Sequence, residues 1–255
     1  MIRITYVTVT YNAAGVLQRT LDSVLQQDYP ELVHLIIDGA STDGTLQMVD
    51  AYIERSNAAE NGHRIQVMSE PDKGIYDAMN KGLRSLDGDY VCFLNAGDFL
   101  PAPDTVSRIV EMLNGQLPAV LYGDTDIVDG EGRFLHHRRL SPPEQLSWKS
   151  FRQGMLVCHQ AFYARTDFAI ATPYDTHYRY SADVDWCIRV MKAAAKENVP
   201  LLNLNMVVVN YTEEGQTTLH HRESLWERYR VMERHYGRLQ TFLLHCWFVV
   251  RSVIK

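Results

Sequence analysis

Two short stretches of this chain are apolar almost throughout, and each runs into an acidic turn. Residues 32–37 lead into Asp38, and residues 90–94 lead into Asn95-Ala96-Gly97-Asp98. A strand that is apolar on both faces must be covered on both faces, which is typical of a parallel sheet between layers of helices. Segments with helical spacing alternate with such strands, so the first hundred residues read β-α-β-α-β-α-β. The pattern predicts an α/β fold with a mostly parallel, doubly wound, Rossmann-like sheet.

The other elements follow from β-branched runs, apolar spacing and turn residues. Strands are expected at residues 2–11, 64–69, 119–128, 133–138, 155–158 and 206–211. Helices are expected around residues 17–25, 46–53, 75–84, 106–113, 183–192, 223–236 and 240–254. Residues 129–132 predict a hairpin turn, and residues 140–155 an irregular excursion.

Length and charge narrow the classes of protein. A chain of 255 residues buries roughly 70–75% of its unfolded surface and needs no disulfide or metal to fold. The net charge of −6 argues against a protein that coats nucleic acid. Residues 220–255 carry +4 and the rest −10, which predicts an anionic surface as a partner of the C-terminus. Four scattered cysteines and no visible secretory leader predict a cytoplasmic protein without disulfides.

The turn after residues 32–37 contains two candidate ligands for a nucleotide. Asp38 stands at the tip of a buried strand, where its carboxylate can accept a ring N–H from a pyrimidine or guanine base. Asp43 either binds a ribose or caps the helix that follows, and the sequence does not decide between these two alternatives. In parallel sheets, ligands bind beyond the carboxyl ends of the strands, which is where both residues lie.

The segment from Glu70 to Gly82 is a dense polar loop that leads into a helix. Lys73, Gly74 and the helix N-terminus favour an anion, because Gly74 permits close approach of the backbone. Asp77 and Asn80 lie one turn apart on the same face. A solvated helix start with Gly82 as its C-cap explains part of this segment but not the whole cluster.

The turn from Asn95 to Asp98 predicts a metal site. Mg²⁺ and Mn²⁺ prefer oxygen ligands and bridge phosphate oxygens with one or two protein carboxylates. Asp98 suffices for that role, and the alternative is a tight turn before Pro101. We therefore expect a divalent cation as cofactor.

The segment from Tyr180 to Trp186 begins another helix. Ser181 can cap it, and Asp183 lies in its first turn, where the helix dipole keeps a carboxylate ionised. An ionised carboxylate is a candidate general base, although both Asp183 and Asp185 can also serve only to stabilise the helix. Asp185 and Trp186 either support Asp183 or line a sugar pocket.

Histidines supply further candidates. His159 is expected to contact the acceptor or the donor, and His220 or His221 to complete the metal shell or bind a diphosphate. His136 and His137 read as an exposed strand end.

These segments together resemble a family 2 glycosyltransferase with a GT-A fold, of the kind that assembles bacterial polysaccharides. The run Val-Thr-Val-Thr-Tyr-Asn at residues 7–12 resembles the opening strand of that family, and residues 38–45 resemble its nucleotide-binding loop. Residues 70–82 point to the branch of colanic-acid-type transferases. Residues 95–98 stand where the family keeps an Asp-x-Asp metal motif, with Asn95 in place of the first aspartate. The resemblance covers roughly residues 1–220.

The resemblance implies an inverting transfer of a sugar from a nucleotide-diphosphate sugar, with a UDP-sugar favoured, to a saccharide or lipid-linked saccharide. It implies that Asp38 and Asp72 contact the base and ribose, that Asp98 binds the metal and that Asp183 is the base. Matching segments add further candidates for substrate binding: Thr10, Asn12, Asp43, Lys73, Gly74, Asp77, Asn80, Asn95, Ala96, His159, Asp185 and Trp186.

The expected organisation is a catalytic domain at residues 1–220 and a helical tail at residues 221–255. Residues 1–100 would bind the nucleotide sugar and residues 101–220 the acceptor. Residues 240–254 are strongly apolar but too short to span a bilayer. They either lie in the interface of the inner face of the cell membrane, or dock on the core or a second subunit.

Two other functions remain as alternatives. One is a sugar-nucleotide pyrophosphorylase, although the chain has no glycine-rich, Arg-containing loop after its first strand. The other is an inactive subunit that only binds a nucleotide sugar. A nicotinamide oxidoreductase is excluded because no Gly-x-Gly-x-x-Gly follows Val9.

Overall fold

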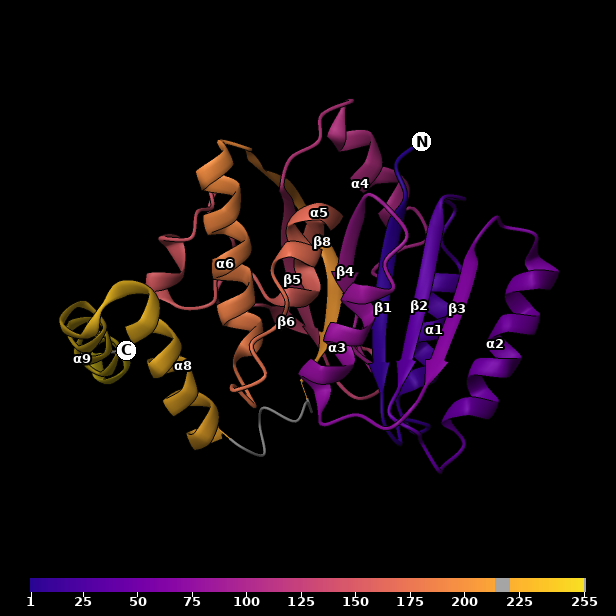
Figure 1. The fold of residues 1–255 in the computed structure, drawn as a ribbon, viewed down its shortest axis with the longest axis horizontal. Coiled ribbons are helices and arrows are strands. Elements are labelled where there is room, and N and C mark those ends of the chain that lie inside the picture. Colours follow the sequence, from indigo (N-terminus) through magenta and orange to yellow (C-terminus); the bar gives the residue numbers. More distant parts are fainter. Residues whose placement is uncertain (214–220, 255) are drawn as a thin grey trace.

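The alternation of strands and helices in the first hundred residues is confirmed. The computed structural model describes residues 1–213 and 221–254. Four strands lie side by side in the order β3-β2-β1-β4, and all neighbouring pairs are parallel. Their carboxyl ends therefore share one edge of the sheet, where the arrowheads of β1 to β3 lie in Figure 1. The elements are β1 (Ile4–Thr10), α1 (Leu17–Leu25), β2 (Leu32–Asp38), α2 (Thr45–Ala59), β3 (Arg64–Ser69), α3 (Ile75–Arg84) and β4 (Tyr90–Phe93).

The second half of the chain extends this sheet with strands of both directions. β7 lies antiparallel between β4 and β5, β6 pairs antiparallel with β5 through the predicted hairpin, and β8 runs parallel to β5. The sheet is thus mostly parallel at one end and mixed at the other. The elements are α4 (Thr105–Leu113), β5 (Val120–Val128), β6 (Phe134–His137), the 3₁₀ helices η1 (Ser150–Gln153) and η2 (His159–Ala161), β7 (Phe162–Arg165), α5 (Thr166–Ala171), α6 (Ala182–Glu197) and β8 (Leu201–Thr212).

The prediction of a strand at residues 155–158 is wrong, because the strand lies a few residues later, at β7. The guanidinium of Arg138 explains the difference, because it donates to the carbonyls of Met155 and Leu156 at 2.7 and 3.2 Å. These carbonyls are thereby satisfied without a strand partner. Both short runs are apolar, so the sequence alone did not separate them.

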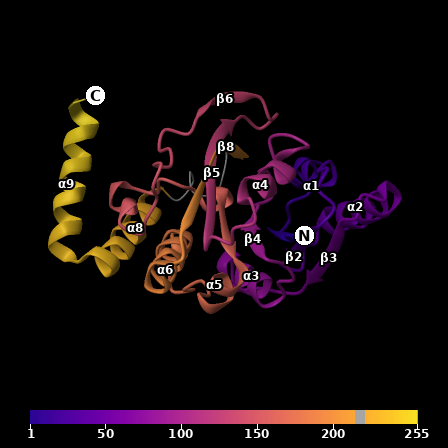
Figure 2. The same cartoon turned by 90° about the horizontal axis from the view of Figure 1, so that it is seen from above.

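Helices cover both faces of the sheet. Figure 2 shows α3, α5 and α6 on one face and α1, α2 and α4 on the other. Gly82 lies inside α3 rather than capping it, which corrects the expected C-cap. A Cβ on Gly82 would lie 2.7 Å from Cγ1 of Val7, so the glycine lets α3 lie close against β1. This close packing sets where the loop before α3 stands at the carboxyl edge.

An aromatic cluster fills the space between α3, α6 and β4. Tyr174 stacks on Trp186 with ring centroids 4.9 Å apart, and on Tyr76 at 5.6 Å. Phe93 of β4 meets both Tyr174 and Trp186 edge-on. The cluster packs beneath the start of α6 and supports it.

The C-terminal helices lie at the end of the molecule far from β1 to β3 (Figures 1 and 2). α8 (His221–Tyr236) packs against α6, and α9 (Arg238–Ile254) follows it after Gly237. Leu239, Phe242, Leu243 and Trp247 of α9 are each more than half exposed. Within residues 1–213 and 221–254, no helix has both the length and the apolar character needed to cross a bilayer.

Candidate active site

Asp38 ends β2 with a carboxylate that is fully buried and fully hydrogen bonded. Its Oδ1 accepts from the hydroxyls of Thr10 and Ser41 at 3.0 and 2.5 Å, and its Oδ2 accepts from Ser69 Oγ and Ser41 N at 2.7 and 2.9 Å. Burial raises the pKa of Asp38, but these bonds outweigh it and lower the pKa below its ordinary value. In this conformation Asp38 ties three strand ends together. Its contact with a base stays a prediction that requires one of these bonds to open.

The loops after β1 and β2 are fixed to each other by side chains from both. Asn12, at a positive φ of 48°, donates its backbone N–H to Ser41 Oγ and accepts the N–H of Thr42. Asp43 accepts from the backbone N–H groups of Ala14 and Thr45, with a further bond from the Thr45 hydroxyl. Of the two alternatives for Asp43, this geometry matches the turn at the start of α2.

The loop after β3 reaches over the loop after β2. A Cβ on Gly39 would lie 2.5 Å from Oδ2 of Asp72, so a glycine is needed for Asp72 to lie against this backbone. Asp72 Oδ1 accepts from the N–H of Gly74, whose φ of +120° suits only glycine. Lys73 is exposed, and its backbone N–H donates to the carboxylate of Asp77 in the first turn of α3. The third strand end thus adds an exposed cation to this edge.

Asp98 lies in the turn after β4 with few donors and little exposure. Its residue is 5% exposed, and among the described residues its two oxygens accept from Gln160 Nε2 and Thr212 N, at 2.9 and 3.0 Å. Burial raises the pKa of Asp98 to about 6, against the smaller lowering effect of these two bonds. A nearby cation would stabilise the ionised form of a carboxylate held in this way.

The same turn supplies a second oxygen. Oδ1 of Asn95 is buried and has no hydrogen-bond partner among the described residues. Ala96, beside it, packs on the α1 and α2 side of the sheet. The carboxylate of Asp98 and the amide oxygen of Asn95 fit a hard divalent cation, which prefers oxygen ligands. Across residues 1–213 and 221–254 no three His, Cys, Asp or Glu side chains form a metal cluster, and His220 lies outside these ranges.

Asp183 is held from two sides at the start of α6. Its Oδ1 accepts from the hydroxyl of Tyr76, and its Oδ2 from Nδ1 of His159, both at 3.1 Å. The amide nitrogen of Asn95 lies 3.1 Å from Nε2 of His159, so this pattern assigns the proton of the neutral ring to Nδ1. Burial raises the pKa of Asp183, but His159 and the charge of Arg228 outweigh it and lower the pKa.

This arrangement places the ionised carboxylate of Asp183 beside the turn of residues 95–98. The side chain of Asp183 retains 15% exposure, so a ligand can reach it. A chain of contacts runs from Asn95 through His159 to Asp183 and Tyr76, and Gln160, the residue after His159, contacts Asp98. Such a carboxylate can remove a proton from a hydroxyl group. β2 and β4 flank β1, so Asp38 and Asp98 stand at the same edge.

Three further predicted ligands make their described contacts within the protein. Both ends of the Asn80 amide bond the backbone of Tyr174, at 2.8 and 3.0 Å. Trp186 is fully buried in the aromatic cluster, which favours support of Asp183 over a sugar pocket. Asp185 is fully buried and faces away, toward His235 and Arg189. Substrate contacts by these side chains stay predictions.

The sequence interpretation did not single out several residues of the site. Tyr76, Gln160 and Arg228 each act on a predicted carboxylate. Tyr76 lies 107 residues from Asp183 and Gln160 lies 62 residues from Asp98, while Arg228 is on α8. Ser181 occupies the N-cap position of α6, as predicted, but its side chain makes no capping hydrogen bond to the helix. Tyr76 belongs to the dense segment 70–82, which was the only available signal for it.

Comparison with known proteins gives a family and several relatives. The model described as Glycosyl transferase family 2 matches residues 5–172. A PGL/p-HBAD biosynthesis glycosyltransferase of Mycobacterium bovis is 31% identical over 257 residues, which are 96% of this chain and 94% of that protein. A chondroitin synthase of Pasteurella multocida is 24% identical and matches 82% of this chain but 20% of that protein. Neither of these two relatives is described as a colanic-acid transferase, so that branch stays a prediction.

Solved structures share the fold. The structure of S. aureus TarS 1–349 in complex with UDP-GlcNAc has a TM-score of 0.71 at 17% identity, and covers 91% of this chain and 65% of that chain. The mannosyltransferase PcManGT of Pyrobaculum calidifontis, in complex with GDP-Man and Mn²⁺, has a TM-score of 0.63 at 20% identity, with 91% and 64% covered. The chain therefore spans slightly less than two thirds of these solved chains. At such identities the likeness concerns the fold alone.

Proposed function

The chain belongs to glycosyltransferase family 2, and from that premise we propose that it transfers a sugar from a nucleotide-diphosphate sugar to a hydroxyl group with inversion. The observation that carries this proposal is the placement of Asp183. It is held by His159 and Tyr76 at the carboxyl edge, beside the turn that contains Asp98. An inverting transfer needs one base and no covalent intermediate, and one such carboxylate is present.

The donor would bind across the ends of β1 to β4. Asp72, Lys73 and Gly74 supply a carboxylate, a cation and open backbone at the third strand end. A nucleotide carries both a base with N–H donors and an anionic diphosphate, which matches this mixture. We favour a UDP-sugar; the solved relatives were captured with UDP-GlcNAc and with GDP-Man.

The reaction is a single displacement. The acceptor oxygen forms a bond to the anomeric carbon while the bond from that carbon to the diphosphate oxygen breaks. The acceptor proton moves to Asp183, and the nucleoside diphosphate leaves with the electron pair. His159 and Tyr76 fix the two oxygens of Asp183, so that the base is oriented before the acceptor arrives.

Asp98 and Asn95 would hold a divalent cation, Mn²⁺ or Mg²⁺. When bound, such an ion offsets the charge that develops on the departing diphosphate. The buried, unpartnered oxygen of Asn95 and the raised pKa of Asp98 fit that use.

Residues 101–220 would bind the acceptor, a saccharide or lipid-linked saccharide of the cell surface, in a role like that of colanic-acid-type transferases. The long match to a PGL/p-HBAD biosynthesis glycosyltransferase and the partial match to a chondroitin synthase support a glycan or glycolipid product. The division into residues 1–100 and 101–220 follows the change from the parallel to the mixed part of the sheet.

The exposed face of α9 would contact the inner face of the cell membrane. Leu239, Phe242, Leu243 and Trp247 recur at helical spacing with exposures of 57 to 74%, and residues 220–255 carry +4. This charge suits the negative surface of an anionic lipid bilayer. Sedimentation with anionic vesicles, reduced by Phe242→Ser with Trp247→Ser, would support this; a stable dimer in light scattering without vesicle binding would refute it.

The test of the whole proposal is a donor screen followed by one substitution. Thermal shifts with nucleoside diphosphates, with and without Mn²⁺, should identify a base that stabilises the protein more strongly with metal. With that donor, Asp183→Asn should reduce kcat about 10³-fold while the nucleotide still binds. Full activity of this variant would end the mechanism, and absence of activity in the unaltered protein would favour the inactive binding subunit. Pyrophosphorylase activity would be recognised by release of a sugar 1-phosphate.

A further inference from the structure

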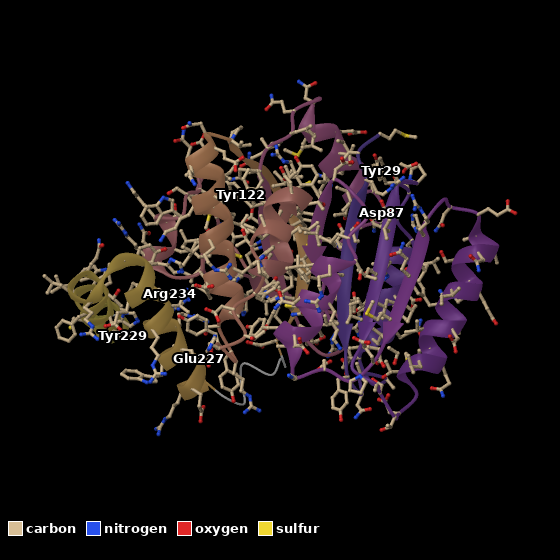
Figure 3. All side chains as sticks on the ribbon, viewed as in Figure 1. Tyr29, Asp87, Tyr122, Glu227, Tyr229 and Arg234 are labelled. Atoms are coloured by element: carbon tan, nitrogen blue, oxygen red, sulfur yellow. The ribbon has the colours of Figure 1, made fainter. Side chains whose placement is uncertain are left out.

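A glutamate of α8 binds the backbone immediately before α6. Oε1 of Glu227 accepts the N–H of Arg179 at 2.8 Å, and its Oε2 accepts those of Tyr180 and Ser181 at 2.6 and 3.1 Å. Figure 3 labels Glu227 where α8 faces the lower end of α6. Three consecutive N–H groups that converge on one carboxylate form a concave anion site. Here the anion is part of the protein itself.

This contact fixes the backbone that leads into α6, and unlike the usual N-cap bond it does not reach the N–H groups of residues 182–184 in the first turn. The hydroxyl of Ser181 donates to the carbonyl of Ser224 on α8 at 3.2 Å, and α6 has no side-chain capping bond of its own. The start of α6 is therefore fixed by α8, about 45 residues further along the chain. Asp183 lies two residues after Ser181, so its position depends on the same contact.

A second set of contacts ties α8 to the first turn of α6. Asp185, fully buried, accepts from Nε2 of His235 on α8 at 2.7 Å. Nδ1 of His235 lies 2.9 Å from Nζ of Lys192, which is on α6. These contacts hold α6 and α8 together independently of Glu227. The bonds of Glu227 are therefore not needed to pack the two helices, and they fix only the backbone before α6.

We propose that Glu227 is a positioning residue for sugar transfer: it holds the backbone of residues 179–181 and so sets the place of Asp183 between His159 and Tyr76. The proposal rests on the proposed function, in which Asp183 removes the proton of the acceptor. It gives α8 a part in the reaction, although residues 221–255 had been expected only as a tail.

The expected cost follows from geometry. Both oxygens of Glu227 accept, so the amide of Glu227→Gln provides one acceptor oxygen and points its NH₂ group at a backbone donor. At least one N–H before α6 then loses its partner, and the first turn shifts. A misplacement of about 1 Å at a reacting group reduces a rate roughly 10²-fold.

The experiment compares Glu227→Gln with Glu223→Gln, an exposed glutamate one turn earlier on α8. Glu227→Gln should lower kcat about 10- to 100-fold with KM for the donor within about twofold, and should speed amide exchange over residues 178–186. Glu223→Gln should change neither. Glu227→Asp keeps both acceptor oxygens and should recover part of kcat.

A cycle with Asp183→Asn separates this proposal from the proposed function. If Glu227 acts through Asp183, Glu227→Gln should cost little further rate in the Asp183→Asn background. An equal loss in both backgrounds, or a kcat equal to that of Glu223→Gln, would overturn the positioning role while leaving the transferase intact. Full activity of Asp183→Asn alone would instead overturn the assignment of the base. If residual rates are too low to compare, unchanged amide exchange in Glu227→Gln would still contradict the proposal.

Discussion

Two carboxylates at one edge of the sheet are held in opposite ways. Asp38, after β2, accepts four hydrogen bonds and has a lowered pKa. Asp98, after β4, accepts two from the described residues and has a pKa raised to about 6. Both residues are nearly inaccessible to solvent, but Asp98 lies deeper in the protein, so burial raises its pKa more. The deeper burial and the smaller number of donors together separate the two carboxylates. This contrast supports a role of Asp38 in organising the loops and agrees with the proposed cation at Asp98.

The donors also come from different distances along the chain. Those of Asp38 lie within 31 residues of it, whereas Gln160 and Thr212 lie 62 and 114 residues from Asp98. The proposed nucleotide side of the site is therefore a local structure of the first three strands, and the proposed metal side is assembled from residues far apart in the chain. The predictions below test this difference.

The largest expected effect is on activity. Asp98→Asn should reduce kcat/KM about 10³-fold, since an amide loses the charge that holds a divalent cation. The fold should persist, because the amide can still accept from Thr212 N and can donate to a reoriented Gln160. Metal-dependent kinetics measure this, with the exposed Asp104→Asn as control. Unaltered metal dependence would show that Asp98 is not the ligand.

Asp38→Asn should act on stability instead. An amide offers one acceptor oxygen to four donors, so the free energy of unfolding should fall by about 3 kcal/mol. Urea denaturation at neutral pH measures it. A loss no larger than that of Asp98→Asn would remove the distinction between the two carboxylates.

The two carboxylates should give opposite dependence on pH. The pKa of Asp98 is raised from 3.8 to about 6, so its contribution to stability is full below pH 3.8 and is lost as the pH rises through 6, by about 3 kcal/mol. Asp38 has a lowered pKa, so its contribution is present above pH 3.8 and is lost as the pH falls. Unfolding with EDTA present, at several pH values, should show Asp98→Asn gaining on the unaltered protein between pH 4 and 7. A parallel pair of curves would contradict this.

The smallest effect should come from a single donor. Ser69→Ala removes one of the four bonds to Asp38, at 2.7 Å, and should cost about 1 kcal/mol of unfolding free energy. The remaining three bonds should keep kcat and KM nearly unchanged. A large loss of activity at constant stability would instead indicate that Ser69 contacts the donor.

Much of the fold could be predicted because it depends on local patterns. The parallel strands around Asp38 and the helix that carries Asp77 follow from apolar runs and spacing. The strand at Phe162–Arg165 could not be separated from the run at Met155, because only the long-range bond from Arg138 decided between them. For the candidate site, acidic turns at strand ends identified Asp38 and Asp98, and the acidic first turn of a predicted helix identified Asp183.

The sequence by itself determined that Asp38 and Asp98 lie at the same edge of the sheet, because the carboxyl ends of parallel strands share one edge. Only the tertiary structure decided their states. Asp183 is ionised and oriented by His159 and Tyr76, and the start of its helix is fixed by Glu227 from the C-terminal part of the chain. The physical reason is that a pKa and an orientation depend on nearby donors and burial, and distance in space is not encoded in local spacing.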